Sequence, residues 1–299
     1  MNRRKIFGDD RQMKAVIGMG KAEFEALLPA FSQAWYMELK LASPNRVRKI
    51  GGGKKGALPR MEDKLFAILL YLKTYPTFDV LGFLTGRDRT NSCRSTHFLL
   101  KVLERALDKK FVLPERKITS VKEFFEKFPE ARDIFPDGTE RPVQRPKNAS
   151  KRKKLYSGKK KRFTRKTIVV ADEKKRILIL TPTKSGRRHD KRLLDKSGLP
   201  KVIPDSVAVF ADTGFQGMER DHPNTLIPKK ATKHHPLTEH DKQNNRIISG
   251  LRIVAEHAIG GMKRFKAAAD IYRNRIPNTD DQFYLLAAGL WNFHLQQAT

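Results

Sequence analysis

The first third of the chain alternates apolar and polar residues with the three- and four-residue spacing of amphipathic helices. AEFEALLPAFSQAWYMEL, within residues 1–43, has this spacing, and MEDKLFAILLYLKTYP repeats it. In the second segment the apolar residues share one helical face: Leu65, Ile68, Leu69 and Leu72. Pro76 is expected to end that helix, because proline lacks the backbone N–H that a helix interior needs. The pattern therefore predicts an all-helical N-terminal region.

A helix-turn-helix pattern follows in TFDVLGFLTGRDRTNSCRSTHFLLKVLERALDKK. A short apolar helix over 78–84 meets a turn at Gly86, and a second helix is expected to begin near residue 90 and to run to about residue 107. The start of such a second helix reaches base edges and phosphates in DNA-binding motifs. The residues in that position are Arg87, Arg89, Asn91 and Arg94. The alternative is an ordinary helical hairpin with a solvated basic end.

From about residue 130 the pattern changes to short apolar runs between turn residues, which predicts strands. The runs are 133–146, 163–171, 176–182 and the segment SVAVFAD, with a short helix expected over 189–199. This order predicts a mixed sheet with helices on its faces, which is an α+β or α/β domain. We therefore expect a helical domain over 1–125, with the helix-turn-helix at about 60–108, and a second domain over 126–299.

Charge points to a polyanionic partner. The chain has 299 residues, 62 Lys and Arg against 32 Asp and Glu, and a formal net charge of +30. From Arg145 to Lys166 there are twelve basic residues and no acidic ones, with Tyr156 and Phe163 between them. A basic hairpin over 145–171 would suit a phosphate backbone, because each neutralised phosphate releases counterions. An anionic membrane surface is the weaker alternative, since no strong basic amphipathic helix with aromatic residues on its other face is present.

Cys93 is the single cysteine, which excludes an intrachain disulfide and a cysteine-based zinc site. The N-terminus MNRRKIFGDD has no apolar run behind it, so no signal peptide is expected, and the apolar stretches are too short for a membrane span. These features fit a cytoplasmic protein associated with the nucleoid.

Three acids stand out as candidate metal ligands. Asp137 lies on a predicted strand in PDGTE, and Asp212 ends another strand in VAVFADTGFQG. Glu256 lies on a predicted helix, NRIISGLRIVAEHAIGGMKRFK. An aspartate at a strand end could simply cap the turn. Three convergent carboxylates, however, need a cation to compensate their charge, and ligands that offer only oxygen favour Mg²⁺ or Mn²⁺. Two such ions would activate a nucleophile for phosphodiester chemistry.

On that helix we expect an apolar core-facing side and a polar stripe opposite to it. The apolar positions are Ile247, Leu251, Val254, Ala258, Met262 and Phe265. The polar stripe holds Ser249, Arg252, Glu256 and Lys263, which lie within roughly 60° of each other at 100° per residue. An exposed helical salt bridge between Arg252 and Glu256 would explain the same stripe without any function.

The chain resembles the DDE transposases of bacterial insertion sequences, in the group called insertion sequence family five. The matching segments are DGTERPVQRPKN, YSGKKKRFTRK, HDKRLLD, FADTGFQG and LRIVAEHAIGGMKRFK followed by YRNR, over roughly residues 60–296. The resemblance implies an N-terminal helix-turn-helix domain and an RNase H-like catalytic domain. It also implies an enzyme that binds terminal inverted repeats, nicks DNA with Mg²⁺ and joins the free 3′-hydroxyl to a target.

Carried over by position, the resemblance implies that Asp137, Asp212 and Glu256 are the catalytic, metal-binding triad. Related transposases place Tyr, Arg, Glu and Lys along the last helix, and here Ser249 stands at the Tyr position. The residues expected to contact DNA, besides those of the helix-turn-helix, are Arg145, Lys159, Lys160, Lys161, Arg162, Arg252, Lys263 and Arg264. Holding two transposon ends implies a homodimer or larger homo-oligomer on DNA.

Three other functions stay open from the sequence. A domesticated transposase or repressor would bind DNA through the same helix-turn-helix without catalysis. A nuclease that hydrolyses DNA without strand transfer would share the acidic site. A structural RNA-binding protein is supported by charge alone, and it would have no use for three convergent carboxylates.

Overall fold

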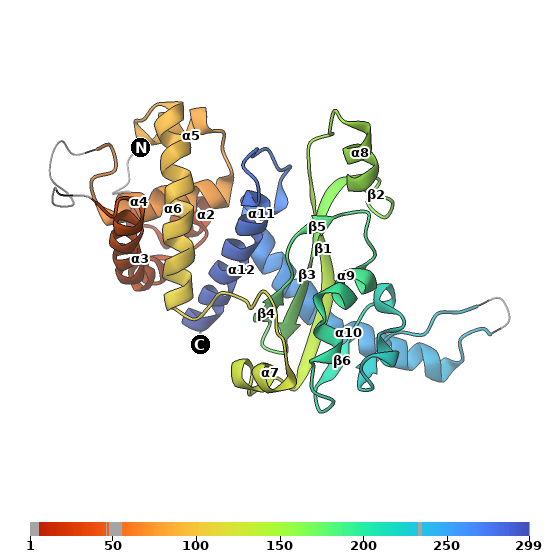
Figure 1. The fold of residues 1–299 in the computed structure, drawn as a ribbon. Coiled ribbons are helices and arrows are strands. Elements are labelled where there is room, and N and C mark those ends of the chain that lie inside the picture. The colour runs from red at the N-terminus through yellow and green to blue at the C-terminus, as the bar shows by residue number, and fades with distance from the viewer. Residues whose placement is uncertain (1–5, 46, 48–55, 233–234, 299) are drawn as a thin grey trace. The chain divides into compact units, whose positions relative to one another are not determined.

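The computed structural model describes residues 6–45, 47, 56–232 and 235–298. Their contacts divide the chain into two compact units (Figure 1). The helical unit consists of 1–113, 262–270 and 282–299, and the sheet unit consists of 114–261 and 271–281. The helical unit thus takes in two C-terminal segments that the sequence pattern grouped with the second domain.

The helical unit contains these helices: α2 (Asp10–Ile17), α3 (Lys21–Ala42), α4 (Met61–Thr74), α5 (Phe78–Thr85), α6 (Arg89–Lys109), α11 (Lys266–Ala269) and most of α12 (Thr279–Ala298). α4 is its central helix, because every residue from 65 to 72 is buried. The four apolar residues predicted to share one face of α4 are all in the core, and the helix ends before Pro76 as expected.

α5 and α6 form the predicted helix–turn–helix geometry. Gly86 ends α5 in the left-handed conformation, at φ 68°, which glycine adopts without the steric cost that a Cβ brings. The Asp88 carboxylate then caps α6 by accepting the backbone N–H of Asn91 at 2.9 Å. Gly82 keeps the turn tight, since a Cβ there would lie 2.4 Å from the Arg87 carbonyl oxygen.

The sheet unit holds the strands β1 (Asp133–Pro142), β2 (Tyr156–Ser157), β3 (Arg162–Asp172), β4 (Ile177–Leu180), β5 (Lys184–Ser185), β6 (Ala208–Phe210) and β7 (Thr225–Leu226). Its helices are α7 (Val121–Lys127), α8 (Ala149–Leu155), α9 (Asp190–Ser197) and most of α10 (Glu239–Lys263). β3 pairs with β1 and with β4 in antiparallel fashion, whereas β1, β6 and β7 are parallel. The order β4-β3-β1-β6-β7 of this mixed sheet confirms the RNase H-like α/β fold.

The strands predicted over 163–171 and 176–182 and the helix over 189–199 are confirmed as β3, β4 and α9. Two expectations need correction. α8 interrupts the basic segment, which the sequence analysis described as a hairpin. α10 begins at Glu239, earlier than its apolar spacing indicates, because its first turns are polar.

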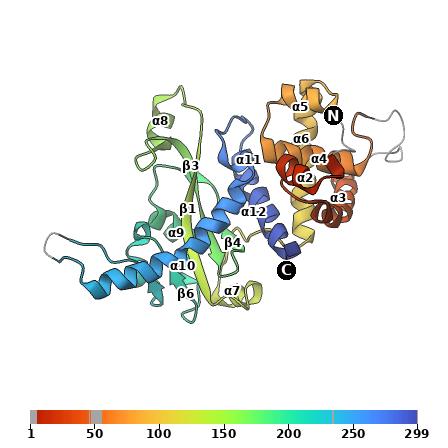
Figure 2. The same ribbon diagram turned by 180° about the vertical axis from the view of Figure 1, so that it is seen from behind.

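Helices cover the two faces of the sheet, with α9 in front of it in Figure 1 and α10 in front of it in the reverse view of Figure 2. Side chains alternate along β1 accordingly. Ile134 joins a large apolar cluster with Leu193 and Leu194 of α9. Phe135 points to the opposite face and packs with Phe210 of β6 and with α10. Among the residues that the structure describes, no helix is long and apolar enough to cross a membrane.

Candidate functional site

Asp137 lies on β1, and Asp212 lies two residues after the adjacent parallel strand β6. β1 and β6 pair with Asp133 opposite Ala208, so continuing that register brings Asp137 beside Asp212. Phe135 and Phe210, two residues before each aspartate, stack with ring centroids 5.4 Å apart. Because side chains two apart on a strand share a face, both aspartates extend toward the face that α10 covers. The sheet thus fixes this pair of carboxylates.

Asp212 makes the turn that follows β6. One of its carboxylate oxygens accepts the backbone N–H of Gly214 and the hydroxyl of Thr213, both at 2.9 Å. Burial acts to raise the pKa of Asp212, but these hydrogen bonds and the charge of Arg252 outweigh it, so the pKa is lowered. The capping role and the placement beside Asp137 therefore coexist in one residue.

The pKa of Asp137 is shifted in the opposite direction, upward. Burial raises its pKa, against a 2.7 Å hydrogen bond from the backbone N–H of Gly138 and the charge of Arg252. The nearby charges of Asp212 and Asp190 raise it further. A carboxylate crowded by like charges at the end of a buried stretch of strand is a site that a cation would stabilise.

Asp190, the first residue of α9, is a site residue that the sequence analysis missed. Its carboxylate lies against the two glycines that follow the aspartates: a Cβ at Gly138 would meet its Oδ1 at 2.5 Å, and one at Gly214 would meet its Oδ2 at 3.3 Å. Asp190 reaches them from the α9 face of the sheet. The sequence signal for this residue was the segment HDKRLLD, which begins at His189 and matches the family, but the match assigned no role to Asp190.

Lys166 compensates the charge of Asp190. Its Nζ lies 2.9 Å from Asp190 Oδ1 and 3.0 Å from Glu140 Oε1, and all three side chains are almost completely buried. Burial acts to lower the pKa of Lys166, but the two carboxylates outweigh it and the pKa is raised. Glu140 also accepts the Thr164 hydroxyl at 2.6 Å. This buried ion cluster of Glu140, Lys166 and Asp190 joins β1, β3 and α9 directly beneath the aspartate pair.

α10 presents Arg252, and not Glu256, toward the pair. Arg252 is half-buried, and its charge opposes the rise in the pKa of Asp137 and helps to lower the pKa of Asp212. Ala255 packs on the stacked phenylalanines. Glu256, one turn after Arg252, is exposed. The apolar face expected for this helix is wrong in its first half, where Ile247 and Leu251 are exposed. In Figures 1 and 2 the N-terminal end of α10 extends past the edge of the sheet.

The aspartate pair fits Mg²⁺ or Mn²⁺ by donor type and by charge, since it offers carboxylate oxygens only, one on β1 and one in the turn after β6. The third ligand is not in place. Among the described residues, no three His, Cys, Asp or Glu side chains are grouped so that they could hold a metal ion. Neither Glu256 nor Asp190 therefore completes such a group with the pair in this conformation.

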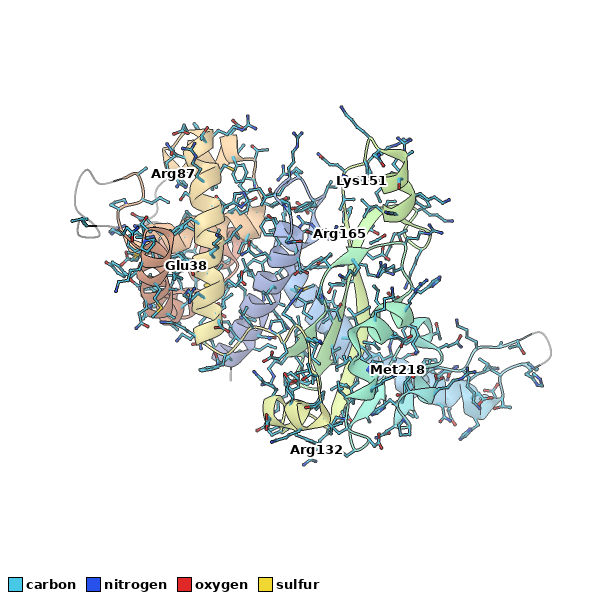
Figure 3. All side chains as sticks on the ribbon, in the orientation of Figure 1. Glu38, Arg87, Arg132, Lys151, Arg165 and Met218 are labelled. Atoms are coloured by element: carbon cyan, nitrogen blue, oxygen red, sulfur yellow. The ribbon has the colours of Figure 1, made fainter. Side chains whose placement is uncertain are left out.

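The basic segment brings exposed cations to the same unit. Arg145 is exposed, as are Lys159, Lys160 and Lys161 in the turn between β2 and β3 and Arg162 at the start of β3. Figure 3 marks Lys151 on α8 and Arg165 on β3 within this segment. The two remaining candidates lie in the helical unit: Lys263 is half-buried, and Arg264 donates to the Gly18 carbonyl oxygen at 3.3 Å.

The helix-turn-helix residues differ in exposure. Arg89, Asn91 and Arg94 are exposed at the start of α6, with Arg89 3.8 Å from the exposed Asp79. Arg87, labelled in Figure 3, is half-buried, and its Nε donates to the Thr85 hydroxyl at 3.2 Å. Burial lowers the pKa of Arg87. Arg89, Asn91 and Arg94 are thus the members of this set that are open to a partner.

Comparisons with known proteins agree with the geometry. The family model described as DDE superfamily endonuclease matches residues 136–292. A probable transposase for the insertion sequence element IS702, from Microchaete diplosiphon, is 31% identical over 244 residues, which cover 81% of this chain and 84% of that protein. No solved structure matches the chain.

Proposed function

Because the chain belongs to the DDE superfamily of endonucleases, among the insertion-sequence transposases, we propose that it cuts DNA at the ends of its element and joins the freed 3′-hydroxyl to a target. Its DNA partners would be terminal inverted repeats and target DNA. Because two ends must be held during the reaction, it would act as a homodimer or larger assembly on DNA.

The observation that carries this proposal is the parallel register of β1 and β6 in a mixed sheet of RNase H-like order, which brings Asp137 beside Asp212 when it is continued past the end of β6. An electrostatic DNA-binding protein has no need of two aligned, partly buried carboxylates, which cost folding free energy unless a cation compensates them. A carboxylate pair of this kind suits a metal-dependent phosphodiester reaction.

In the proposed site Asp137 and Asp212 hold the divalent cation, with Glu256 as the third ligand. The cation, when bound, supplies charge stabilisation and an activated nucleophile. Arg252 lies beside both aspartates and partly neutralises their charge. We propose that, once the cation neutralises the aspartates, Arg252 binds a DNA phosphate instead. Glu256 lies four residues after Arg252 on the same helix, so a small movement of α10 would change the positions of both side chains relative to the aspartates.

The test is incubation of the purified full-length protein with a supercoiled plasmid that carries the element's own ends, with Mg²⁺, with Mn²⁺ and with EDTA. Metal-dependent cleavage together with joined products supports a transposase. Cleavage without joined products would make the protein an endonuclease. Specific binding of the ends without cleavage in any buffer would overturn the catalytic proposal and favour a non-catalytic DNA-binding protein.

The helix-turn-helix gives a separate prediction. Replacing Arg94 with alanine should weaken binding to the terminal sequence by about 1–3 kcal/mol and weaken binding to random DNA much less, if the side chain reads a base edge. Arg89→Ala should act in the same direction. Binding constants measured at one salt concentration check this, with the exposed Arg11 of α2 replaced by alanine as a control. Equal weakening on both DNAs would reduce the role of these residues to phosphate contacts.

A further inference from the structure

A cavity of about 910 Å³ opens in the sheet unit between α8, the β2–β3 turn and the loop before α9. It adjoins the aspartate pair, because one of its lining residues, Gly214, donates its backbone N–H to Asp212 at 2.9 Å. Asp190, beneath the pair, lines it as well.

The lining is strongly cationic. Six cations of its wall are exposed or half-exposed: Arg145, Arg152, Lys153, Lys159, Arg187 and Arg188. The single carboxylate in the lining belongs to Asp190, whose charge Lys166 compensates at 2.9 Å. The cavity therefore offers a net positive environment to an anion that carries more than one phosphate.

Two aromatic rings make this more than a phosphate-binding surface. Tyr156 and Phe163 are paired across β2 and β3, with ring centroids 5.8 Å apart and planes at 67°. Both line the cavity, and Tyr156 is 42% exposed. Part of its aromatic surface is thus available to a ligand. Phosphates need no aromatic partner, whereas bases stack on aromatic rings in single-stranded nucleic-acid sites.

The ligand that suits both features is an unpaired nucleotide. A volume of this order holds a small ligand or a nucleotide or two, and a DNA duplex, whose major groove alone is about 12 Å wide, is far larger. We propose that this cavity takes an unpaired nucleotide at the end of the DNA strand being processed, with its base against Tyr156 and its flanking phosphates on the surrounding cations. This inference rests on the proposed function and names the DNA form that its site would accept.

The test measures binding in EDTA, so that no catalysis is required. The full-length protein is titrated with a blunt duplex, with the same duplex carrying a short single-stranded overhang, and with that overhang made abasic, at one salt concentration. The wild type should bind the normal overhang at least about fivefold more tightly than the abasic one, the factor that stacking of one base provides. A 2-aminopurine base in the overhang should lose fluorescence on binding, because it stacks.

Tyr156→Ala should remove both the preference for the normal overhang and the fluorescence loss, and Tyr156→Phe, which keeps the ring, should retain both. Phe125→Ala is the matched control, since Phe125 is 45% exposed in the same unit and does not line the cavity; it should behave as the wild type. Thermal melting of each variant verifies that it is folded.

Two results would overturn the inference: equal affinity of the wild type for normal and abasic overhangs, or equal weakening of all three DNAs by Tyr156→Ala, which would mean a general DNA-binding surface. Either result would leave plasmid cleavage untouched. Conversely, a wild type that discriminates the overhangs and yet cleaves no plasmid would retain the nucleotide cavity and lose the proposed catalysis, so the two failures are distinct.

Discussion

Replacing Asp137 with asparagine should abolish DNA cleavage and, in metal-free buffer, raise the melting temperature of the protein. The folded-state pKa of Asp137 is raised, chiefly by burial and further by Asp212 and Asp190. Its ionised form therefore costs folding free energy at neutral pH, and this cost disappears as the pH falls and the carboxyl group takes up its proton. A neutral asparagine removes the cost at every pH, as expected where a functional site opposes stability.

We expect cleavage to fall at least about a hundredfold, since a proposed metal ligand is lost. We expect the melting temperature in EDTA to rise by about 2–4 °C, which corresponds to about 1 kcal/mol for a unit of this size. Mg²⁺ should then stabilise the wild type, by about 2.7 kcal/mol at a hundred times its dissociation constant, and should not stabilise the variant. Plasmid cleavage and thermal melting with and without Mg²⁺ measure all three effects.

Asp133→Asn is the matched control, because Asp133 lies four residues earlier on β1; it should change neither cleavage nor the response to Mg²⁺. Asp212→Asn should lose cleavage without the gain in stability, since the pKa of Asp212 is lowered and its carboxylate accepts two hydrogen bonds. If Asp137→Asn lowered the melting temperature in EDTA and left the Mg²⁺ response intact, Asp137 would support the fold and not a metal.

The strand that precedes Asp212 could be predicted from the sequence because its pattern is local. Five apolar residues followed by an acid and two glycines describe a buried strand and its turn without reference to any other segment. The helix-turn-helix was predictable for the same reason, since Gly86 and the cap at Asp88 act within a few residues. The register that sets Asp137 beside Asp212 agrees with the resemblance, but hydrophobic spacing alone does not determine it.

The orientation of α10 could not be predicted, because it depends on where the sheet ends. Ile247 and Leu251 have the spacing of a core-facing stripe, yet both are exposed, and the N-terminal end of the helix extends past the sheet (Figure 2). Arg252 consequently turns toward the aspartates while Glu256 is exposed. Helical periodicity shows which residues share a face, but it does not show which face the rest of the chain will cover.

The role of Lys166 was hidden by composition. It is the last of the twelve basic residues within 145–166, all of which the charge pattern describes as solvated or phosphate-facing. In the fold the other two basic residues of β3 are exposed (Arg162) and half-buried (Arg165), whereas Lys166 is buried between Glu140 and Asp190. Lys166 lies 24 or more positions from each of its two partners in the sequence, so no local pattern predicts the pairing.

Replacing Lys166 with methionine should therefore produce the largest loss of stability among the substitutions considered. Methionine keeps much of the length of the side chain but leaves Glu140 and Asp190 buried without their common cation, a change that typically costs about 3–5 kcal/mol. The melting temperature should fall by roughly 6–20 °C at pH 7. The pKa of Glu140 is lowered, because hydrogen bonds from Thr164 and Lys166 outweigh its burial, so the stability from Glu140 is lost as the pH falls. The difference between wild type and variant should shrink toward pH 4, where the unpaired carboxylates of the variant become protonated.

Lys174→Met is the matched control for this prediction. Lys174 makes an ion pair of similar length, with its Nζ 2.8 Å from Glu130 Oε2, but the two side chains are 68% and 75% exposed. Removing that pair should leave the melting temperature almost unchanged, since solvent screens exposed charges. Thermal melting of both variants between pH 4 and pH 8 distinguishes the effect of losing a buried cation from the effect of losing an exposed one. If the two substitutions lowered the melting temperature equally, the buried ion cluster would not hold β1, β3 and α9 together beneath the aspartates, and another interaction would have to fix the position of Asp190 against Gly138 and Gly214.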